Sequence, residues 1–242
     1  MASKRKHQIR ALLKSIETGD SAAVAVVNPT TYIQHNPQTR EGGEGLAALF
    51  KRLSMSSPRV NVVRVFEDGD YVFAHTEYDF SSSKIGFEVF RFEGDLVVEH
   101  WDNIQERQGP NSSGESMVDG PTEVSDLALT EPNRKIVGSF LDDIFVNRRL
   151  ENLGKYIEKA RYTEHSPEID IGERANAMEY HQVHRVLAEG NYVLAVSEGS
   201  KGDVHSAFYD LFRVSGGKLV EHWDTIEAIP PRTGWKNDNG KF

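Results

Sequence analysis

Apolar residues recur at helical spacing near the beginning of the chain and again just past its middle. In both segments they lie three or four positions apart, which lines them along one face of a helix. The Gly19-Asp20 pair predicts the end of the first helix. The residues with this spacing are Ile9, Leu12, Leu13 and Ile16 in the first segment, and Ile136, Phe140 and Ile144 in the second.

After the first predicted helix, short apolar-rich runs are separated by turn residues. Gly-Asp, Ser-Ser-Ser and Glu-Gly-Asp lie between the runs and predict antiparallel strands. Helices followed by such a meander predict an α+β fold with the helices on one face of a sheet. A twisted sheet around helices forms a cone, whose mouth commonly holds a small-molecule pocket. The expected strands are Val60–Phe66, Tyr71–Phe80, Phe87–Phe92 and Leu96–Gln105.

The chain repeats its own sequence. The segment from Phe87 to Phe92 returns as the segment from Tyr209 to Val214, and Val-Glu-His-Trp-Asp returns at the same offset of 122 residues. Upstream, Tyr-Ile-Gln-His-Asn-Pro is matched by Tyr-Thr-Glu-His-Ser-Pro. Similar motifs in the same order predict a duplicated domain of about 105 residues.

The repeat sets the expected domain bounds. The first domain covers residues 1–106 and the second covers 134–242. Residues 107–133 are rich in Gly, Pro, Ser and acidic residues, which is typical of a linker. A linker of this length is expected to lie along the surface or to reach across to the partner domain.

Charge and composition exclude several classes of protein. The 242 residues contain no cysteine, which removes disulfides and thiolate metal sites. The net charge is −9 and no basic stripe is present, so nucleic acid is not an expected partner. The longest purely apolar stretch, Ala22–Val27, is too short to span a membrane. We expect a soluble, cytoplasmic protein.

Five features of the sequence resemble the SnoaL-like polyketide cyclase family of the nuclear transport factor 2-like superfamily. They are Tyr-Ile-Gln-His-Asn-Pro at 32–37, Gly-Asp-Tyr-Val at 69–72, Phe-Arg before a turn, Val-Glu-His-Trp-Asp at 98–102, and the segment 229–242. The resemblance covers both copies. It implies two tandem cone-shaped α+β barrels, each with helices on a curved, mainly antiparallel sheet. Because family members commonly dimerise through sheet faces, it also implies an intramolecular pseudo-dimer with one pocket per half. Whether that pseudo-dimer pairs again into a homo-oligomer is left open.

Strand alternation selects candidate site residues in the first copy. His100 and Asp102 point to one side of the last strand, so both can enter one cavity. We expect His75 on a neighbouring strand and His35 at the pocket mouth to join Asp102, with Tyr32 at the rim. The resemblance implies that Asp102 is a general base acting without a metal or cofactor, while His35 and His75 stabilise an enolate. The expected ligand is a small hydrophobic molecule, such as a carbonyl compound.

The second copy keeps only part of this set. Tyr162, His165, His222 and Asp224 persist, but Val196 replaces His75. His184 lies on the adjacent strand, from which it could compensate. The first copy is therefore expected to hold the better-equipped site.

Two alternatives and one exclusion accompany this hypothesis. The His-Trp-Asp motif can instead be structural, and the pockets can bind a ligand without turnover or be filled by the protein's own side chains, as in a scaffold. An empty cavity in each half would favour ligand binding. No His-x-His or His-Glu-x-x-His spacing occurs, so no metal site is predicted.

Overall fold

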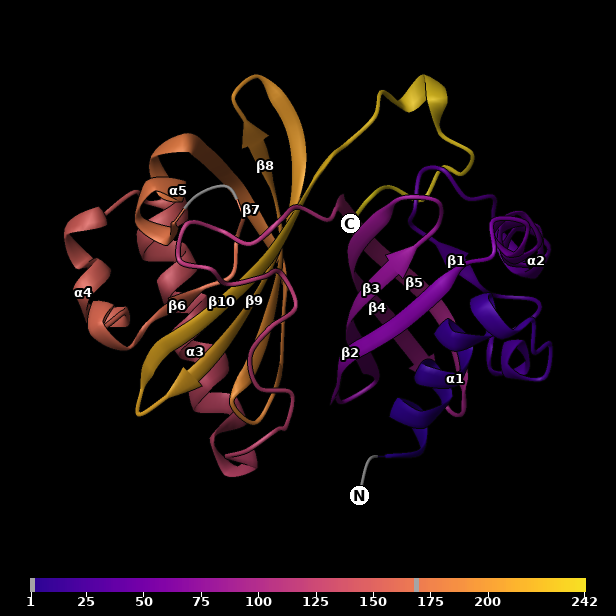
Figure 1. The fold of residues 1–242 in the computed structure, drawn as a ribbon, viewed down its shortest axis with the longest axis horizontal. Coiled ribbons are helices and arrows are strands. Elements are labelled where there is room, and N and C mark those ends of the chain that lie inside the picture. Colours follow the sequence, from indigo (N-terminus) through magenta and orange to yellow (C-terminus); the bar gives the residue numbers. More distant parts are fainter. Residues whose placement is uncertain (1–2, 168–169) are drawn as a thin grey trace. The chain divides into compact units, whose positions relative to one another are not determined.

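The computed structural model describes residues 3–167 and 170–242, and its contacts divide the chain into two compact units (Figure 1). The first unit contains Met1–Glu106 and Pro230–Phe242, and the second contains Arg107–Ile229. The units therefore differ from the expected domains, because residues 107–133 belong with the second unit and the last segment belongs with the first.

The first unit has two α-helices and a five-stranded sheet with the strand order β1-β5-β4-β3-β2. All neighbouring strands are antiparallel except β1, which pairs with β5 in parallel. The elements are α1 (Lys4–Thr18), a short 3-10 helix (Ala23–Val26), β1 (Ile33–Gln34), α2 (Gly42–Ser54), β2 (Arg59–Asp68), β3 (Tyr71–Asp79), β4 (Ser83–Glu93) and β5 (Leu96–Glu106).

Helix α1 begins and ends at residues that satisfy its free backbone groups. The Ser3 side chain accepts a hydrogen bond from the Lys6 amide at 3.2 Å, and Gly19 ends the helix with φ of 71°. That left-handed conformation favours glycine, because other residues would strain their Cβ atom. The four apolar residues predicted to share a face, at positions 9, 12, 13 and 16, are all buried, which confirms the predicted helix.

The second unit repeats the strand order, as β6-β10-β9-β8-β7, again with a parallel first pair. Its elements are α3 (Thr130–Phe140), which continues as a wider turn (Leu141–Val146), α4 (Leu153–Tyr156), β6 (Thr163–Glu164), α5 (Ile171–Ala177), β7 (Met178–Glu189), β8 (Tyr192–Lys201), β9 (Val204–Ser215) and β10 (Lys218–Ala228). Short 3-10 helices cover Leu127–Leu129, Leu150–Asn152, Lys159–Arg161 and, in the first unit, Arg232–Gly234. The α+β prediction is confirmed, and the matching strand orders are consistent with a duplication.

The core of the first unit lies between its helices and one side of its sheet, which we call the helix face. Ile9 and Leu12 of α1 belong to one buried cluster with Val72, Ala74 and Phe90. Ala74 pairs with Glu88, and Glu88 pairs with Asp102. Since directly paired residues point to the same side of a sheet, Glu88 and Asp102 lie on the helix face.

Each unit is completed by a segment that follows the last strand of the other copy. In the first unit, Asn237 donates hydrogen bonds to the carbonyl oxygens of Asn36 (2.8 Å) and Thr39 (2.9 Å), and Asn239 donates one to Gln34 (3.0 Å). In the second unit, the indole of Trp223 donates to the carbonyl oxygen of Asp119 at 2.9 Å. The linker is therefore an ordered part of the second unit.

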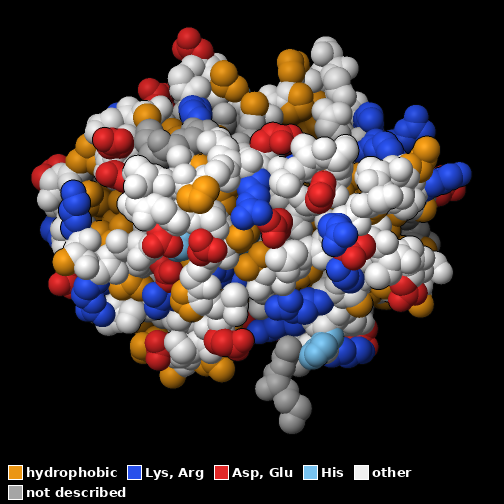
Figure 2. Space-filling view, viewed as in Figure 1, with side chains coloured by type: hydrophobic (Ala, Val, Ile, Leu, Met, Phe, Trp, Pro, Cys, Tyr) orange, Lys and Arg blue, Asp and Glu red, His pale blue; other side chains and the backbone are white. Residues whose placement is uncertain are grey.

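The surface carries charges of both signs. On the face shown in Figure 2, Lys and Arg side chains are interspersed with Asp and Glu. Among the described residues, no helix combines the length and the apolar character needed to cross a membrane.

We expect Asn237→Ala to destabilise the chain by about 1–3 kcal/mol, because two carbonyl oxygens would lose their donor in a buried setting. Urea denaturation followed by tryptophan fluorescence measures this loss. Asp238→Ala, at the exposed next position, is the matched control and should change the free energy of unfolding by less than about 0.5 kcal/mol. Equal effects of the two variants would contradict the structural role of this segment.

Candidate functional site

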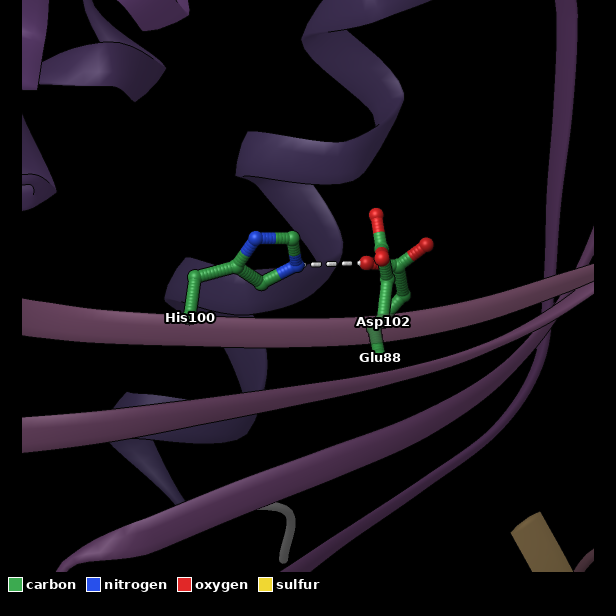
Figure 3. Close-up of side chains that lie close together, drawn as sticks. All are labelled: Glu88, His100 and Asp102. Atoms are coloured by element: carbon green, nitrogen blue, oxygen red, sulfur yellow. Dashed lines mark hydrogen bonds and ion pairs between the residues drawn. The ribbon is translucent and has the colours of Figure 1, made fainter. Parts of the chain in front are cut away.

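Three ionisable side chains meet on the helix face of the first unit. Glu88 comes from β4, and His100 and Asp102 come from β5; they are 4%, 8% and 6% exposed. One ligand atom from each lies within 4.8 Å of the other two. Figure 3 shows the two carboxylates side by side at one edge of the His100 ring. The adjacent strands thus concentrate acid and imidazole groups in a buried place.

The segment around β1 fixes the tautomer of His100. Gln34 Oε1 accepts a hydrogen bond from the Asn36 amide at 2.9 Å, which identifies this atom as the oxygen. His100 Nδ1 lies 3.0 Å from the same oxygen and must therefore donate its proton to it. The other ring nitrogen, Nε2, faces the carboxylates.

Glu88 is held from two sides. Tyr78 donates its hydroxyl proton to Glu88 Oε1 at 2.7 Å, and His100 Nε2 lies 2.6 Å from Glu88 Oε2. Because neither a bare ring nitrogen nor a carboxylate can donate, one proton must lie between His100 and Glu88. His100 and Glu88 therefore share one proton next to Asp102.

Asp102 has one oxygen engaged and one without a hydrogen bond. Asn36 donates to Oδ2 at 2.6 Å, whereas the buried Oδ1 has no hydrogen-bond partner. Lys241 donates to the backbone oxygen of Asp102 at 2.9 Å, and its ammonium lies 3.6 Å from Oδ1. This oxygen is thus the most available acceptor of the cluster.

The two histidines expected beside Asp102 lie on the opposite face of the sheet. His75 pairs with Phe87, and Phe87 pairs with Asn103. Asn103 directly follows Asp102 on β5, so these side chains point to the other face of the sheet. Its ring stacks on Phe87 at 4.5 Å, and Arg64 donates a hydrogen bond to its Nδ1 at 3.0 Å. The grouping of His75 with Asp102 is therefore corrected: the face of β3 that carries Phe73 and His75 is not the one that faces the helices.

His35 also points away from Asp102. Its Nδ1 donates to the carbonyl oxygen of Gly240 at 2.9 Å, and its Nε2 lies 2.9 Å from Glu99. Its ring stacks on Trp101 with 4.6 Å between the ring centres. His35 thus holds the C-terminal segment in place instead of meeting a ligand on the helix face. The expected role of His35 beside Asp102 is corrected accordingly.

The second unit builds a related cluster with more charge. His222 lies between Glu164 (2.7 Å from Nδ1) and Asp210 (3.0 Å from Nε2). Burial lowers the pKa of His222, but the two carboxylates outweigh burial and raise that pKa from 6.5 to about 10. Glu164 occupies the position that Gln34 has in the first unit. The carboxylate in place of the amide favours the protonated, positively charged form of His222.

Arg174 of α5 neutralises both aspartates of the second cluster. Its guanidinium bonds to Asp224, lies 2.9 Å from Asp210, and donates to the Tyr180 hydroxyl at 2.8 Å. Burial opposes ionisation of Asp210, but Arg174 and His222 overcome it and lower the pKa of that carboxyl. For Asp224 burial dominates, and its pKa is raised. A guanidinium thus lies where the first unit has none.

The remaining predicted residues divide between the two faces. Tyr32 is 3% exposed in the core of the first unit, where its hydroxyl accepts a hydrogen bond from Gln34 at 3.3 Å. Tyr162 donates to Glu164 at 2.9 Å. His165 repeats the arrangement of His35, stacked on Trp223 at 4.7 Å, and His184 pairs with Glu198 at 2.9 Å, both away from Asp224. The expected placement of His165 and His184 in the pocket is corrected.

The sequence prediction missed nine members of the two clusters. One signal was available: Tyr32, Gln34 and Asn36 alternate along the segment, which places all three side chains on one side of an extended chain, and Glu164 matches Gln34 in the second copy. The other missed residues approach from separate elements and carry no local motif. They are Tyr78, Glu88 and Lys241 in the first unit and Arg174, Tyr180 and Asp210 in the second.

Open grooves occur elsewhere on the first unit. The largest of those described has a volume of about 600 Å³ and is lined mainly by apolar residues of the 3-10 helix and α2, including Val24, Val27 and Leu46. A groove of about 410 Å³ lies beside Lys14 and Tyr78. Neither is lined by Asp102.

The second cluster should respond to high pH. Because folded His222 holds its proton more tightly than an unfolded histidine, its contribution to stability is complete below about pH 6.5 and is lost as the pH rises through its pKa of about 10. We expect Glu164→Gln to lower the pH at which the ring titrates, measured by ring nitrogen and carbon NMR shifts. Glu158→Gln, at an exposed position, should leave it unchanged. A neutral His222 at pH 8 in the unaltered protein would contradict the cluster.

Comparison with known proteins finds one matching family and several similar solved structures. Residues 9–100 match the SnoaL-like domain family. Structural neighbours include IdmH from Streptomyces antibioticus (15% identity, 43% of this chain and 93% of that chain, TM-score 0.38) and TsrD from Streptomyces laurentii (18%, 43% and 92%, 0.38). An LEH-like epoxide hydrolase from M. tuberculosis is similar at 17% identity, with 42% and 82% coverage and a TM-score of 0.37. No curated protein sequence matches the chain. Residues 9–100, which form most of the first unit, are thus similar to the SnoaL-like domain family.

Proposed function

We propose that the first unit binds a small, largely apolar carbonyl compound and catalyses proton transfer of the cyclase or isomerase type, with Asp102 as general base. The observation that carries this proposal is the buried Asp102 Oδ1, which accepts no hydrogen bond. A carboxylate oxygen kept from water and from donors is free to take a proton from a substrate carbon.

Tyr32 is the proposed donor to the enolate oxygen. Its hydroxyl accepts a hydrogen bond from Gln34, so its own proton can be given to a ligand. Burial, with the charges of Asp102 and Glu88, raises the pKa of Tyr32 well above its ordinary value. The phenol therefore stays protonated at neutral pH and can stabilise developing negative charge. In this role Tyr32 replaces the expected His35 and His75.

The His100–Glu88 pair completes the proposed chemistry. It holds one proton beside Asp102, and Gln34 and Tyr78 fix its two members. After Asp102 removes a proton from the α carbon, this pair gives a proton to the product. The proton on Asp102 then passes to the pair, which restores both groups. The sequence of steps needs only groups of this chain.

The second unit is proposed to be non-catalytic. Arg174 contacts both aspartates of its cluster, and breaking this buried contact to free Asp224 would leave charges without partners. Ligand binding without turnover, or a purely structural role, fits this cluster better than proton transfer.

We also propose that the two copies pair as an intramolecular pseudo-dimer. Large apolar residues on the face opposite the helices support it: Phe73 and Trp101 in the first sheet, and Leu194 and Trp223 in the second. Sheet faces of this composition are suited to association.

Exchange of α protons tests the general base. Incubating the protein in D₂O with 2-tetralone, a bicyclic ketone, and following loss of the α-proton NMR signal measures proton abstraction directly. We expect Asp102→Asn to slow exchange about a hundredfold, because the base is lost while the shape is kept. The matched control, Asp224→Asn in the second unit, should leave the rate unchanged. An unchanged rate in Asp102→Asn would end the assignment.

The oxyanion donor has its own test. Tyr32→Phe removes one hydroxyl and should slow the same exchange by about a hundredfold, because it deletes one donor to the enolate. The affinity for the ketone, measured by calorimetry, should change much less. Tyr162→Phe is the equivalent change in the second unit, and a similar loss there would contradict the role of Tyr32.

A further inference from the structure

We infer that Glu88, His100 and Asp102 form a binding site for one divalent transition-metal ion, such as Zn²⁺, Co²⁺ or Mn²⁺. The site offers one imidazole nitrogen and two carboxylate oxygens, a donor set that suits these ions. The inference concerns binding and does not depend on the proton-transfer function proposed for the same residues.

The geometry brings the three ligand atoms to one place. They lie within 4.8 Å of one another, and all three residues are more than nine-tenths buried. Glu88 and Asp102 are directly paired across β4 and β5, which fixes the two carboxylates side by side on the helix face (Figure 3). Small side-chain rotations would bring such atoms to bonding distances of about 2 Å.

Each ligand is oriented by a neutral neighbour. Gln34 accepts the Nδ1 proton of His100, which leaves Nε2 as the metal-facing nitrogen. Tyr78 holds Glu88 Oε1, and Asn36 holds Asp102 Oδ2. One oxygen of each carboxylate is therefore fixed by a donor and the other remains for the ion. Supporting hydrogen bonds of this kind are typical of metal sites.

An unsatisfied atom independently points to a missing ligand. Asp102 Oδ1 is buried and has no hydrogen-bond partner, and the closest positive group, the ammonium of Lys241, stays 3.6 Å away. A buried carboxylate oxygen without a donor is costly, and coordination of a cation would satisfy it.

The second unit shows what a carboxylate pair at this position requires. There the guanidinium of Arg174 contacts Asp210 and Asp224, which pair across β9 and β10 as Glu88 and Asp102 do across β4 and β5. Arg174 lies four positions after Asp170, the residue that precedes α5. The position four residues after Glu41, which precedes α2, is Gly45. A Cβ at Gly45 would come within 1.9 Å of the Arg40 carbonyl oxygen, so no side chain fits. The first unit thus has the acidic pair without the internal arginine, with the Lys241 ammonium 3.6 Å from Asp102 Oδ1, and a metal ion would contact both carboxylates as Arg174 does in the second unit.

Lys241 should oppose binding through its charge, because its ammonium lies 3.6 Å from Asp102 Oδ1.

Metal titration of the full chain tests this inference. After dialysis against EDTA, calorimetry with Zn²⁺, Co²⁺ or Mn²⁺ alone should show one ion bound per chain. We expect Glu88→Gln, His100→Gln and Asp102→Asn each to weaken binding by about tenfold or more. Lys241→Met should tighten binding severalfold, because a competing positive charge is removed.

Two control variants separate this site from adventitious binding. Glu106→Gln makes the same charge change at an exposed end of β5, and His205→Gln removes a surface imidazole that lies 2.7 Å from Glu198. Both should bind as the unaltered protein does. Loss of binding in His205→Gln, retention in the Glu88→Gln and Asp102→Asn double variant, or no binding at millimolar metal would overturn the inference. Circular dichroism of each variant shows whether it is folded, and the one-ion stoichiometry of the unaltered protein needs no variant.

The two proposals fail separately. Metal binding is read without substrate, and proton exchange from the ketone is read in metal-free buffer. A chain that binds no metal but exchanges α protons through Asp102 would overturn only the metal site, and the reverse result would overturn only the general base.

Discussion

Two carboxylates placed directly opposite each other on neighbouring strands are the constraint that organises the helix face of each unit. Like charges in this position repel, and burial removes the water that would screen them. In each unit, protons and positively charged side chains from several elements offset this repulsion. The second unit uses Arg174 and a charged His222, and the first uses a proton on the His100–Glu88 pair with the Lys241 ammonium nearby. The chemistry available at each cluster follows from how completely the charge is neutralised.

A difference at a single position changes the charge of the cluster. Gln34 and Glu164 occupy matching places in the repeated motif and contact the same nitrogen of the matching histidine. The amide oxygen of Gln34 accepts a hydrogen bond from His100 and adds no charge. The carboxylate of Glu164 instead favours the protonated, positively charged form of His222. One difference between the copies, an amide against a carboxylate at the same nitrogen, thus separates the two clusters.

Sequence patterning predicted the fold well because the apolar spacing reports burial directly. The helix at residues 9–16, the meander of strands and the pairing of His100 with Asp102 on one side of β5 all follow from alternation within single elements. The face of β3 could not be settled in that way, because Phe73 and Ala74 are both buried and the strand is apolar on both sides. Choosing the phenylalanine side placed His75 beside Asp102, and strand pairing shows the opposite. Arg174, Asp210 and Lys241 were missed because contacts across long chain separations leave no local pattern.

The exchange of the segments that follow β5 and β10 has a consequence for biosynthesis. Residues 230–242 leave the ribosome only after the whole second unit, yet they hold His35 and bring Lys241 next to Asp102. In the sheet that is translated first, His35 and Asp102 therefore gain these contacts only when the final stretch arrives. Maturation of the earlier half is in this way coupled to completion of the later one.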